Sequence, residues 1–297
     1  MATLSPDPLM VEESPRATIK RSGPGWWRKL PAGPLIAHRS GDVFCGDALE
    51  CLGSLDDDVA DIVFLDPPFN LGKTYGVEGP RADRLDEVAY QDFVARVIRE
   101  AHRVLRPGGA IFLYHIPKWA IRFTAVLEEN FQFQHWIAVS MKNGFVRGSR
   151  LYPAHYALVH YSKGDALILN RPKIPPATCP HCDEYIRDYG GYKSHIENGV
   201  NLSDVWDDLS PVRHSKYKHR EANELPLALL RRVVGMSGRR DGLLVDPFAG
   251  TGTSVIAARL ARMKYVAGDR EPDHCATIQA RLDALAARKR ATQYSEG

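Results

Sequence analysis

The chain has 297 residues, 44% of them hydrophobic, enough to build one main domain with a sizeable core and insertions. Its formal net charge of +3 excludes a general electrostatic attraction to nucleic acid, so any contact with a polyanion has to be local. Five cysteines without a disulfide-like framework favour a reducing cytoplasm. We find no leader-like segment and no apolar run of about 18 residues, so we expect no membrane association.

Residues 1–34 are rich in Pro, Ser, Arg and Gly and show no hydrophobic period, which predicts a flexible arm. Trp26 and Trp27 interrupt this arm. For this pair, a hydrophobic anchor onto the adjoining domain is favoured over a contact with DNA or with a partner.

From Gly41 onward, short apolar runs alternate with stretches of helical period. The expected strands cover residues 42–47, 61–65, 110–114, 134–140, 156–161, 243–246 and 264–267. The expected helices cover residues 48–55, 92–105, 118–129, 225–234, 255–263 and 272–288. Glycines at 108–109, 235 and 238 are expected to end the second and fourth helices, and 70–89 to form a long loop able to close over a substrate. The alternation predicts an α/β fold with a doubly wound, mostly parallel sheet.

Residues 142–220 break this pattern, and their length predicts an inserted recognition region. Its first strand, expected at 156–161, is also a candidate for the main sheet. Tyrosines are interleaved there with basic residues, a mixture that suits contact with phosphates and bases. Acidic residues are nearly as frequent, so a plain solvated surface is the alternative, with DNA contact favoured. The basic residues are Arg147, Arg150, Arg171, Lys173, Arg187, Lys193, Arg213, Lys216, Lys218 and Arg220.

The buried strand 61–65 stops at two prolines, which continue neither a helix nor a ladder. Open α/β sheets form their ligand crevices at such strand ends. There, Asp66 and the Pro67 carbonyl can accept both hydrogens of an exocyclic amine while Phe69 stacks on its ring. Accepting these bonds turns the nitrogen lone pair toward an electrophile. A strand-ending turn without a function is the plain alternative.

Strand 243–246 runs into a turn with Gly250 and Gly252, then a helix, a strand and Asp269, the plan of a nucleotide-binding βαβ unit. No Gly-Lys-Ser/Thr follows, which excludes a P-loop. Val255 occupies the third glycine position of the dinucleotide fingerprint and disfavours an NAD dehydrogenase. S-adenosylmethionine, with an adenosine and no pyrophosphate, fits the turn better. Its sulfonium methyl is the electrophile that an amine held at Asp66 would attack.

Three motifs, DPPFN (Asp66–Asn70), RVLRPGG (Arg103–Gly109) and DPFAGTGTS (Asp246–Ser254), resemble those of the amino-methyltransferases of DNA. The likeness covers about Gly41–Leu282. The catalytic motif precedes the cofactor motif, with the variable region between them, which resembles the beta class of these enzymes. This resemblance implies a Rossmann-like methyltransferase sheet with a circularly permuted motif order. It also implies methyl transfer from S-adenosylmethionine to a base flipped out of duplex DNA.

The resemblance also implies roles for individual residues. Asp269 would bind the ribose, Asp47 the adenine, and Asn223 would line the methionine end of the cofactor. The implied catalytic set is Asp66, Pro67, Pro68 and Phe69. The implied cofactor-binding set is Asp47, Ala48, Asp66, Asn223, Asp246, Phe248, Ala249, Gly250, Gly252, Thr253 and Asp269.

The resulting division has an arm (1–34), a catalytic half (35–141), an inserted target-recognition region (142–220), a cofactor-binding half (221–290) and a tail (291–297).

Duplex DNA is the expected partner, and the resemblance leaves a homodimer and a companion restriction endonuclease open. An Asp before Pro-Pro-Phe resembles the adenine-N6 enzymes, so adenine is favoured over cytosine N4. The competing functions are methylation of RNA or of protein glutamine, where the cofactor motif comes first, and a catalytically silent DNA-binding module.

A further motif is the pair Cys179 and Cys182, a CxxC turn with histidines downstream. Structural zinc takes four ligands, often from two such pairs, and only one pair is visible. Zinc held by Cys179, Cys182 and two of the downstream histidines is therefore weighed against plain surface thiols. The candidates are His195, His214 and His219, and the first two are preferred. The remaining cysteines and one histidine are expected to be buried and structural: Cys45, Cys51, Cys275 and His115.

Overall fold

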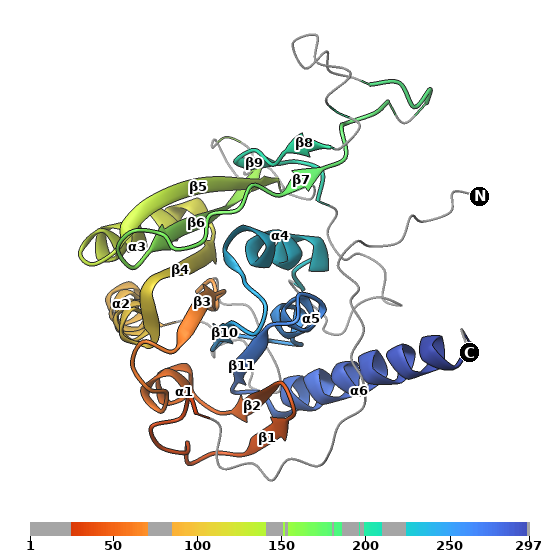
Figure 1. Ribbon diagram of the computed structural model, residues 1–297. Coiled ribbons are helices and arrows are strands. Elements are labelled where there is room, and N and C mark those ends of the chain that lie inside the picture. The colour runs from red at the N-terminus through yellow and green to blue at the C-terminus, as the bar shows by residue number, and fades with distance from the viewer. Residues whose placement is uncertain are drawn as a thin grey trace.

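The computed structural model describes residues 25–70, 85–140, 151, 154–179, 181–185, 196, 199–209 and 224–295, with side chains through residue 287. A nine-stranded sheet with helices on both faces forms its centre (Figure 1). The strand order is β1-β2-β11-β10-β3-β4-β6-β5-β9. The strands are β1 Leu35–His38, β2 Gly41–Cys45, β3 Ala60–Leu65, β4 Leu105–His115, β5 Gln132–Ser140, β6 His155–Ser162, β9 Val205–Trp206, β10 Leu243–Asp246 and β11 Lys264–Asp269.

The five strands β2, β11, β10, β3 and β4 run parallel to one another. β6 is antiparallel to both β4 and β5, β1 is antiparallel to β2, and β9 pairs in parallel with the end of β5. A separate hairpin joins β7 (Lys173–Ile174) to β8 (Val200–Asn201). The prediction of a doubly wound, mostly parallel sheet is confirmed.

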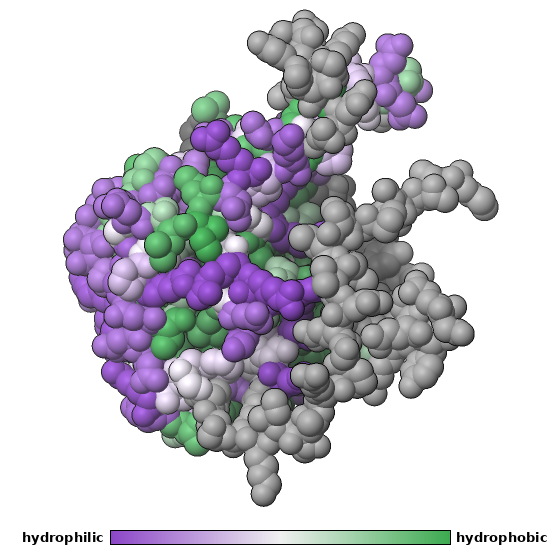
Figure 2. Space-filling view, in the orientation of Figure 1, coloured by the Kyte–Doolittle hydropathy of each residue, from purple (hydrophilic) through white to green (hydrophobic). Residues whose placement is uncertain are grey.

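The helices cover both faces of the sheet, and each face has its own hydrophobic cluster. Along β3, Ile62 and Phe64 pack toward α4, α5 and α6, whereas Val63 and Leu65 pack toward α1, α2 and α3. The outer side of α2 and α3 is hydrophilic (Figure 2). The helices are α1 Ala48–Gly53, α2 Glu87–Val104, α3 Pro117–Glu128, α4 Leu227–Ser237, α5 Thr253–Leu260 and α6 Pro272–Ser295. Within the described ranges, none of them combines the length and apolarity needed to cross a bilayer.

The neighbouring strands β3 and β10 are followed by helices that lie on opposite faces of the sheet. β3 is followed by α2 on one face, and β10 is followed by α5 on the other face. A crevice forms at the carboxyl ends of two strands whose connections diverge in this way. The DPPFN motif begins at the end of β3, and the DPFAGTGTS motif begins at the end of β10.

Several element boundaries differ from those expected. Arg106–Gly109 does not merely end a helix but belongs to β4, because Leu105 pairs with Ala60 and the Gly108 N–H donates to the Lys163 carbonyl over 2.6 Å. α4 continues through Gly235 to Ser237. α2 starts at Glu87, within the stretch expected to be loop, because the Asp86 carboxylate caps it. Long-range pairing and capping outweigh local propensity here.

The described end of the predicted arm, residues 25–34, is bound to the domain and is not a free arm. Both indole N–H groups of Trp26 and Trp27 donate to Asp42 Oδ2, over 3.1 and 2.9 Å. The backbone of Trp27 also forms an isolated antiparallel β-bridge with Leu55. The expected anchoring by the two tryptophans is confirmed, and residues 1–24 lie outside the described residues.

The end of the predicted insert joins the main sheet through β9. Trp206 is fully buried, its indole N–H donates to the Ser203 carbonyl over 2.7 Å, and the Arg232 guanidinium lies 5.2 Å from the centroid of its ring. Residues 205–209 therefore pack on the nine-stranded sheet and α4. The division of the chain into two halves and an insert stays a prediction.

Stability should depend on Asp61 at the start of β3, which is 3% exposed. Its carboxylate accepts hydrogen bonds from Arg239 Nε over 2.6 Å and from the Leu243 N–H over 2.7 Å, and it pairs with Arg106. Asp61→Ala leaves two guanidinium groups without their anion, so we expect the free energy of unfolding to fall by about 3 kcal/mol in urea denaturation.

The matched control is Asp57→Ala, which removes an exposed carboxylate that pairs with Arg103. Solvent screens this pair, so the control should lose much less stability than Asp61→Ala. Equal losses in the two variants would contradict the role given to Asp61.

Candidate active site

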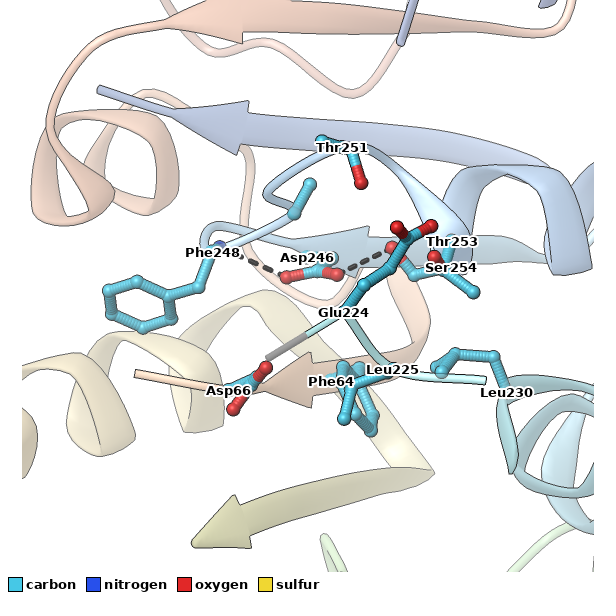
Figure 3. Close-up of a pocket in the computed structure, with 11 residues that line it drawn as sticks. Phe64, Asp66, Glu224, Leu225, Leu230, Asp246, Phe248, Thr251, Thr253 and Ser254 are labelled. Atoms are coloured by element: carbon cyan, nitrogen blue, oxygen red, sulfur yellow. Dashed lines mark hydrogen bonds between the residues drawn. The ribbon is translucent and has the colours of Figure 1, made fainter. Parts of the chain in front are cut away.

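A pocket lies at the carboxyl ends of β3 and β10 (Figure 3). Asp66 comes from the turn after β3 and Asp246 from the end of β10, so the two motifs share one cavity although they are far apart in sequence. The lining residues are Phe64, Asp66, Glu224, Leu225, Leu230, Asp246, Phe248, Ala249, Thr251, Thr253 and Ser254.

The turn from β10 into α5 is held by the carboxylate of Asp246. One oxygen accepts from the Phe248 N–H over 3.0 Å and the other from the Ser254 hydroxyl over 2.5 Å. Gly250 and Gly252 have φ values of 52° and 83°, in the left-handed region. The turn thus keeps its backbone close to the pocket with no side chains at these two positions.

Asp269, the acid expected on the ribose, supports the glycine turn. Its carboxylate accepts hydrogen bonds from the N–H groups of Gly250 over 2.8 Å and Glu271 over 2.9 Å, and lies 3.0 Å from His274 Nδ1. Asp269 is not among the residues that line the pocket. Its carboxylate is therefore hydrogen-bonded to the backbone beside the pocket. Its contact with a ribose stays a prediction.

Asp47 and Ala48 lie at the start of α1, just after β2 and beside the end of β11. The Asp47 carboxylate caps this helix by accepting from the Leu49 N–H over 2.8 Å, and the preceding Gly46 N–H donates to the Asp269 carbonyl over 2.9 Å. Neither Asp47 nor Ala48 lines the pocket. Their adenine contact stays a prediction, and Asn223 lies outside the described residues.

The proline turn after β3 presents Asp66 to the pocket and turns Phe69 inward. Phe69 is only 5% exposed, and its ring centroid lies 4.8, 5.6 and 6.3 Å from those of His115, Tyr156 and Tyr114. The pocket lining does not include Phe69. Stacking of this ring on a target base stays a prediction, and the ring's observed contacts are with this aromatic cluster.

Tyr114 and Tyr156 were not singled out from the sequence, although both lie at ends of expected strands. Burial, then the negative charge of Asp66, raises the pKa of both hydroxyls, and for Tyr114 the neighbouring Tyr156 adds to the effect. Both tyrosines therefore stay neutral at physiological pH. They form a neutral aromatic wall close to the only acid of the catalytic motif.

The pocket is acidic. Among the residues described, its lining contains the carboxylates of Asp66, Glu224 and Asp246 and no cationic side chain. Glu224, not identified from the sequence, is 4% exposed and lies 3.5 Å from Arg281 Nη1, which also donates to the Thr251 carbonyl over 2.8 Å. The charge of this lining complements a cationic ligand.

The CxxC pair forms a tight hairpin in the insert. The Cys179 N–H donates to the Glu184 carbonyl over 2.7 Å, and Thr178 bridges to Tyr185. Hydrogen bonds from the backbone N–H groups of His181 and Cys182, and from the Cys182 side chain, lower the pKa of the Cys179 thiol. The two thiols thus lie together.

The histidines expected to complete a zinc site, His195 and His214, lie outside the described residues. Across the described ranges, no three or more His, Cys, Asp or Glu side chains form a metal-binding group. Zinc therefore stays a prediction. Of the other cysteines, Cys51 and Cys275 are buried as expected, and Cys45 is half-buried.

Comparison with known proteins adds to this geometry. Residues 60–280 match the family model described as DNA methylase. The chain is 43% identical to the type II methyltransferase M.BamHI of Bacillus amyloliquefaciens over 244 residues, which cover 82% of this chain and 57% of the relative. It is 25% identical to the DNA adenine methyltransferase YhdJ of Escherichia coli K12 over 228 residues, covering 74% of this chain and 75% of the relative. The chain thus spans little more than half the length of M.BamHI.

Solved structures show the same fold. The PvuII DNA methyltransferase, described as cytosine-N4-specific, superposes with a TM-score of 0.62 at 16% identity, covering 84% of this chain and 88% of that chain. The complex of M1.HpyAVI with S-adenosylmethionine has a TM-score of 0.54 at 17% identity, covering 81% of this chain and 98% of that chain.

The glycine turn provides a direct test of the pocket. A Cβ at Gly252 would lie 2.7 Å from Ile278 Cγ1, and the φ of 83° is strained for any other residue. We expect Gly252→Ala to lower the free energy of unfolding by about 1–3 kcal/mol and to weaken S-adenosylmethionine binding in isothermal titration calorimetry.

Gly53→Ala is the matched control, because no atom lies within 4 Å of the added Cβ. It should leave both stability and binding nearly unchanged. Wild-type binding by Gly252→Ala would show that the turn does not shape the cofactor pocket.

Proposed function

Because the chain belongs to the DNA methylase family, we propose that it transfers a methyl group from S-adenosylmethionine to the exocyclic amine of a base in duplex DNA. The observation that carries this proposal is the shared cavity: the acid of the catalytic motif and the glycine turn line the same pocket. S-adenosylmethionine is the methyl donor that this family implies.

The pocket chemistry supports this donor. S-adenosylmethionine carries a sulfonium and an ammonium group, and both charges complement the acids that line the cavity. Ala249 and Thr251 of the glycine turn line the pocket where the nucleoside is proposed to bind, and Asp269 beside the turn is the candidate for the ribose hydroxyls. When bound, the donor supplies an electrophilic methyl group. The residues of this chain bind the donor and orient the target amine.

Asp66 and the Pro67 carbonyl are proposed to accept the two hydrogens of the target amine, which aims the nitrogen lone pair at the methyl group. The new N–C bond forms as the C–S bond breaks, and the amine proton leaves through Asp66 to solvent. A base inside the helix cannot reach this turn, so it has to flip out at a cost of a few kcal/mol. Holding amine and methyl group in line provides most of the acceleration.

The target base is proposed to be adenine, methylated at N6. The Asp at the head of the Asp66–Phe69 motif favours this base, and the similarity to the adenine methyltransferase YhdJ supports it. Cytosine N4 is the second candidate, because the same fold carries that specificity in the PvuII enzyme. Both bases present an exocyclic amine of the same chemistry to Asp66.

Duplex DNA is the proposed partner, with base recognition assigned to the insert 142–220, only part of which the structure describes. A homodimer, a companion restriction endonuclease and a cytoplasmic location remain predictions. The relative M.BamHI is described as a type II methyltransferase.

Replacing Asp66 tests the catalytic assignment. Asp66→Ala removes the acceptor of the amine hydrogen, so we expect transfer of tritiated methyl groups to mixed-sequence duplex DNA to fall by about three orders of magnitude. Binding of S-adenosylmethionine should persist, because the glycine turn is untouched. Asp57→Ala, an exposed carboxylate beyond the other end of β3, should keep full activity. An Asp66→Ala variant with wild-type turnover would remove Asp66 from the mechanism.

The base is identified by digesting DNA methylated by the wild-type chain to nucleosides and separating them by mass spectrometry. We expect N6-methyladenine. N4-methylcytosine in its place would establish the second candidate, and the absence of both, with cofactor bound, would contradict methylation of DNA.

A further inference from the structure

The catalytic turn lacks the donors that normally hold a backbone turn. Pro67 and Pro68 have no N–H, so this segment can be fixed only through its carbonyl oxygens or its flanking side chains. The Pro68 carbonyl accepts a hydrogen bond from the Tyr90 hydroxyl over 2.6 Å. A residue of α2 therefore supplies the donor that the turn itself lacks.

Tyr90 is itself held by a histidine. The Tyr90 hydroxyl lies 2.7 Å from His115 Nε2, and the other ring nitrogen of His115 accepts from the Ile116 N–H over 2.8 Å. Tyr90 is 2% exposed and His115 fully buried. Three hydrogen bonds thus connect the end of β4, through α2, to the turn after β3.

The direction of these bonds follows from the chemistry of imidazole. Burial lowers the pKa of His115 to about 3, so the ring is neutral at physiological pH. Because Nδ1 accepts from the Ile116 N–H, the single ring proton sits on Nε2 and is donated to the Tyr90 oxygen. The only hydrogen of the Tyr90 hydroxyl is then left for the Pro68 carbonyl. No other tautomer satisfies all three bonds.

Aromatic packing restrains the same groups. The Tyr90 ring meets Trp119 edge-on at 4.8 Å between centroids, and His115 lies 4.8 Å from the ring of Phe69. His115 therefore restrains the catalytic turn at two points. It orients the hydroxyl on Pro68 and packs against Phe69.

We propose that Tyr90 and His115 are positioning residues for methyl transfer, which hold the carbonyl-only turn so that Asp66 and the Pro67 carbonyl face the target amine. This inference rests on the proposed function. Neither residue lines the pocket, so both act through the turn and not by touching the cofactor. A displacement of the turn by about 1 Å would misalign the amine and slow the transfer.

Turnover of Tyr90→Phe tests the proposal. This variant keeps the ring and its packing but leaves the Pro68 carbonyl without its donor. We expect kcat for DNA methylation to fall by roughly 10- to 100-fold, with Kd for S-adenosylmethionine within about twofold of the wild-type value. His115→Gln retains an amide donor for Tyr90 and should keep more activity than His115→Leu.

The matched control is Tyr161→Phe. Tyr161 is 1% exposed, belongs to the same hydrophobic cluster as Tyr90, and donates its hydroxyl to Glu128 over 2.8 Å, away from the catalytic turn. It should lose comparable stability while keeping kcat. A folded Tyr90→Phe with wild-type kcat, or an equal loss of kcat in Tyr161→Phe, would overturn the positioning role.

A second measurement does not depend on activity. Nitrogen-15 NMR of the full chain should show His115 as the neutral Nε2–H tautomer from pH 6 to 8. A proton on Nδ1, or titration within that range, would refute the hydrogen-bond chain. Wild-type protein that methylates no DNA would overturn the proposed function. By contrast, an active wild type with an equally active Tyr90→Phe overturns only the inference made here.

Discussion

The pairing of β3 with β10 is the contact on which the site depends. Leu244 pairs with Ile62 and Val245 with Val63, so the two strands end side by side. Each strand is buried on both faces, which fixes its register against helices that pack from opposite sides. The chain leaves these ends on opposite faces, and the space between the departing segments is the pocket.

Both turns that border this pocket are built from residues with unusual backbones, and each is held from outside. The proline turn has no N–H donor at Pro67 and Pro68 and receives a hydrogen bond from Tyr90. The glycine turn has φ values that other residues avoid, and the Asp269 carboxylate binds its Gly250 N–H. In each case a neighbouring element supplies a side chain that limits the motion of the backbone. Such support from outside the turn is how a site is held to sub-ångström precision.

The two acids at the ends of β3, Asp61 and Asp66, have different surroundings. At its start, Asp61 is buried and neutralised by Arg106 and Arg239, and it serves the fold. At its end, Asp66 opens to a cavity whose lining carries further acids and no cationic side chain within the described residues. The first carboxylate has its counterions built into the protein. The second faces a cavity suited to a ligand that brings positive charge.

The sequence by itself determined the strand–turn motifs and the α/β class, and it predicted that the proline turn and the glycine turn work together. These features are local: apolar runs, prolines and glycines act within a few residues, so their effect can be read without the fold. Only the tertiary structure decided that Asp66 and Glu224 share a pocket, that Asp269 is engaged by Gly250, and that Phe69 is covered. Tyr90 shows why. It lies between the expected loop 70–89 and the expected helix 92–105, where the sequence assigns it no role. Its contacts with Pro68 and His115 depend on the packing of α2 against β3 and β4.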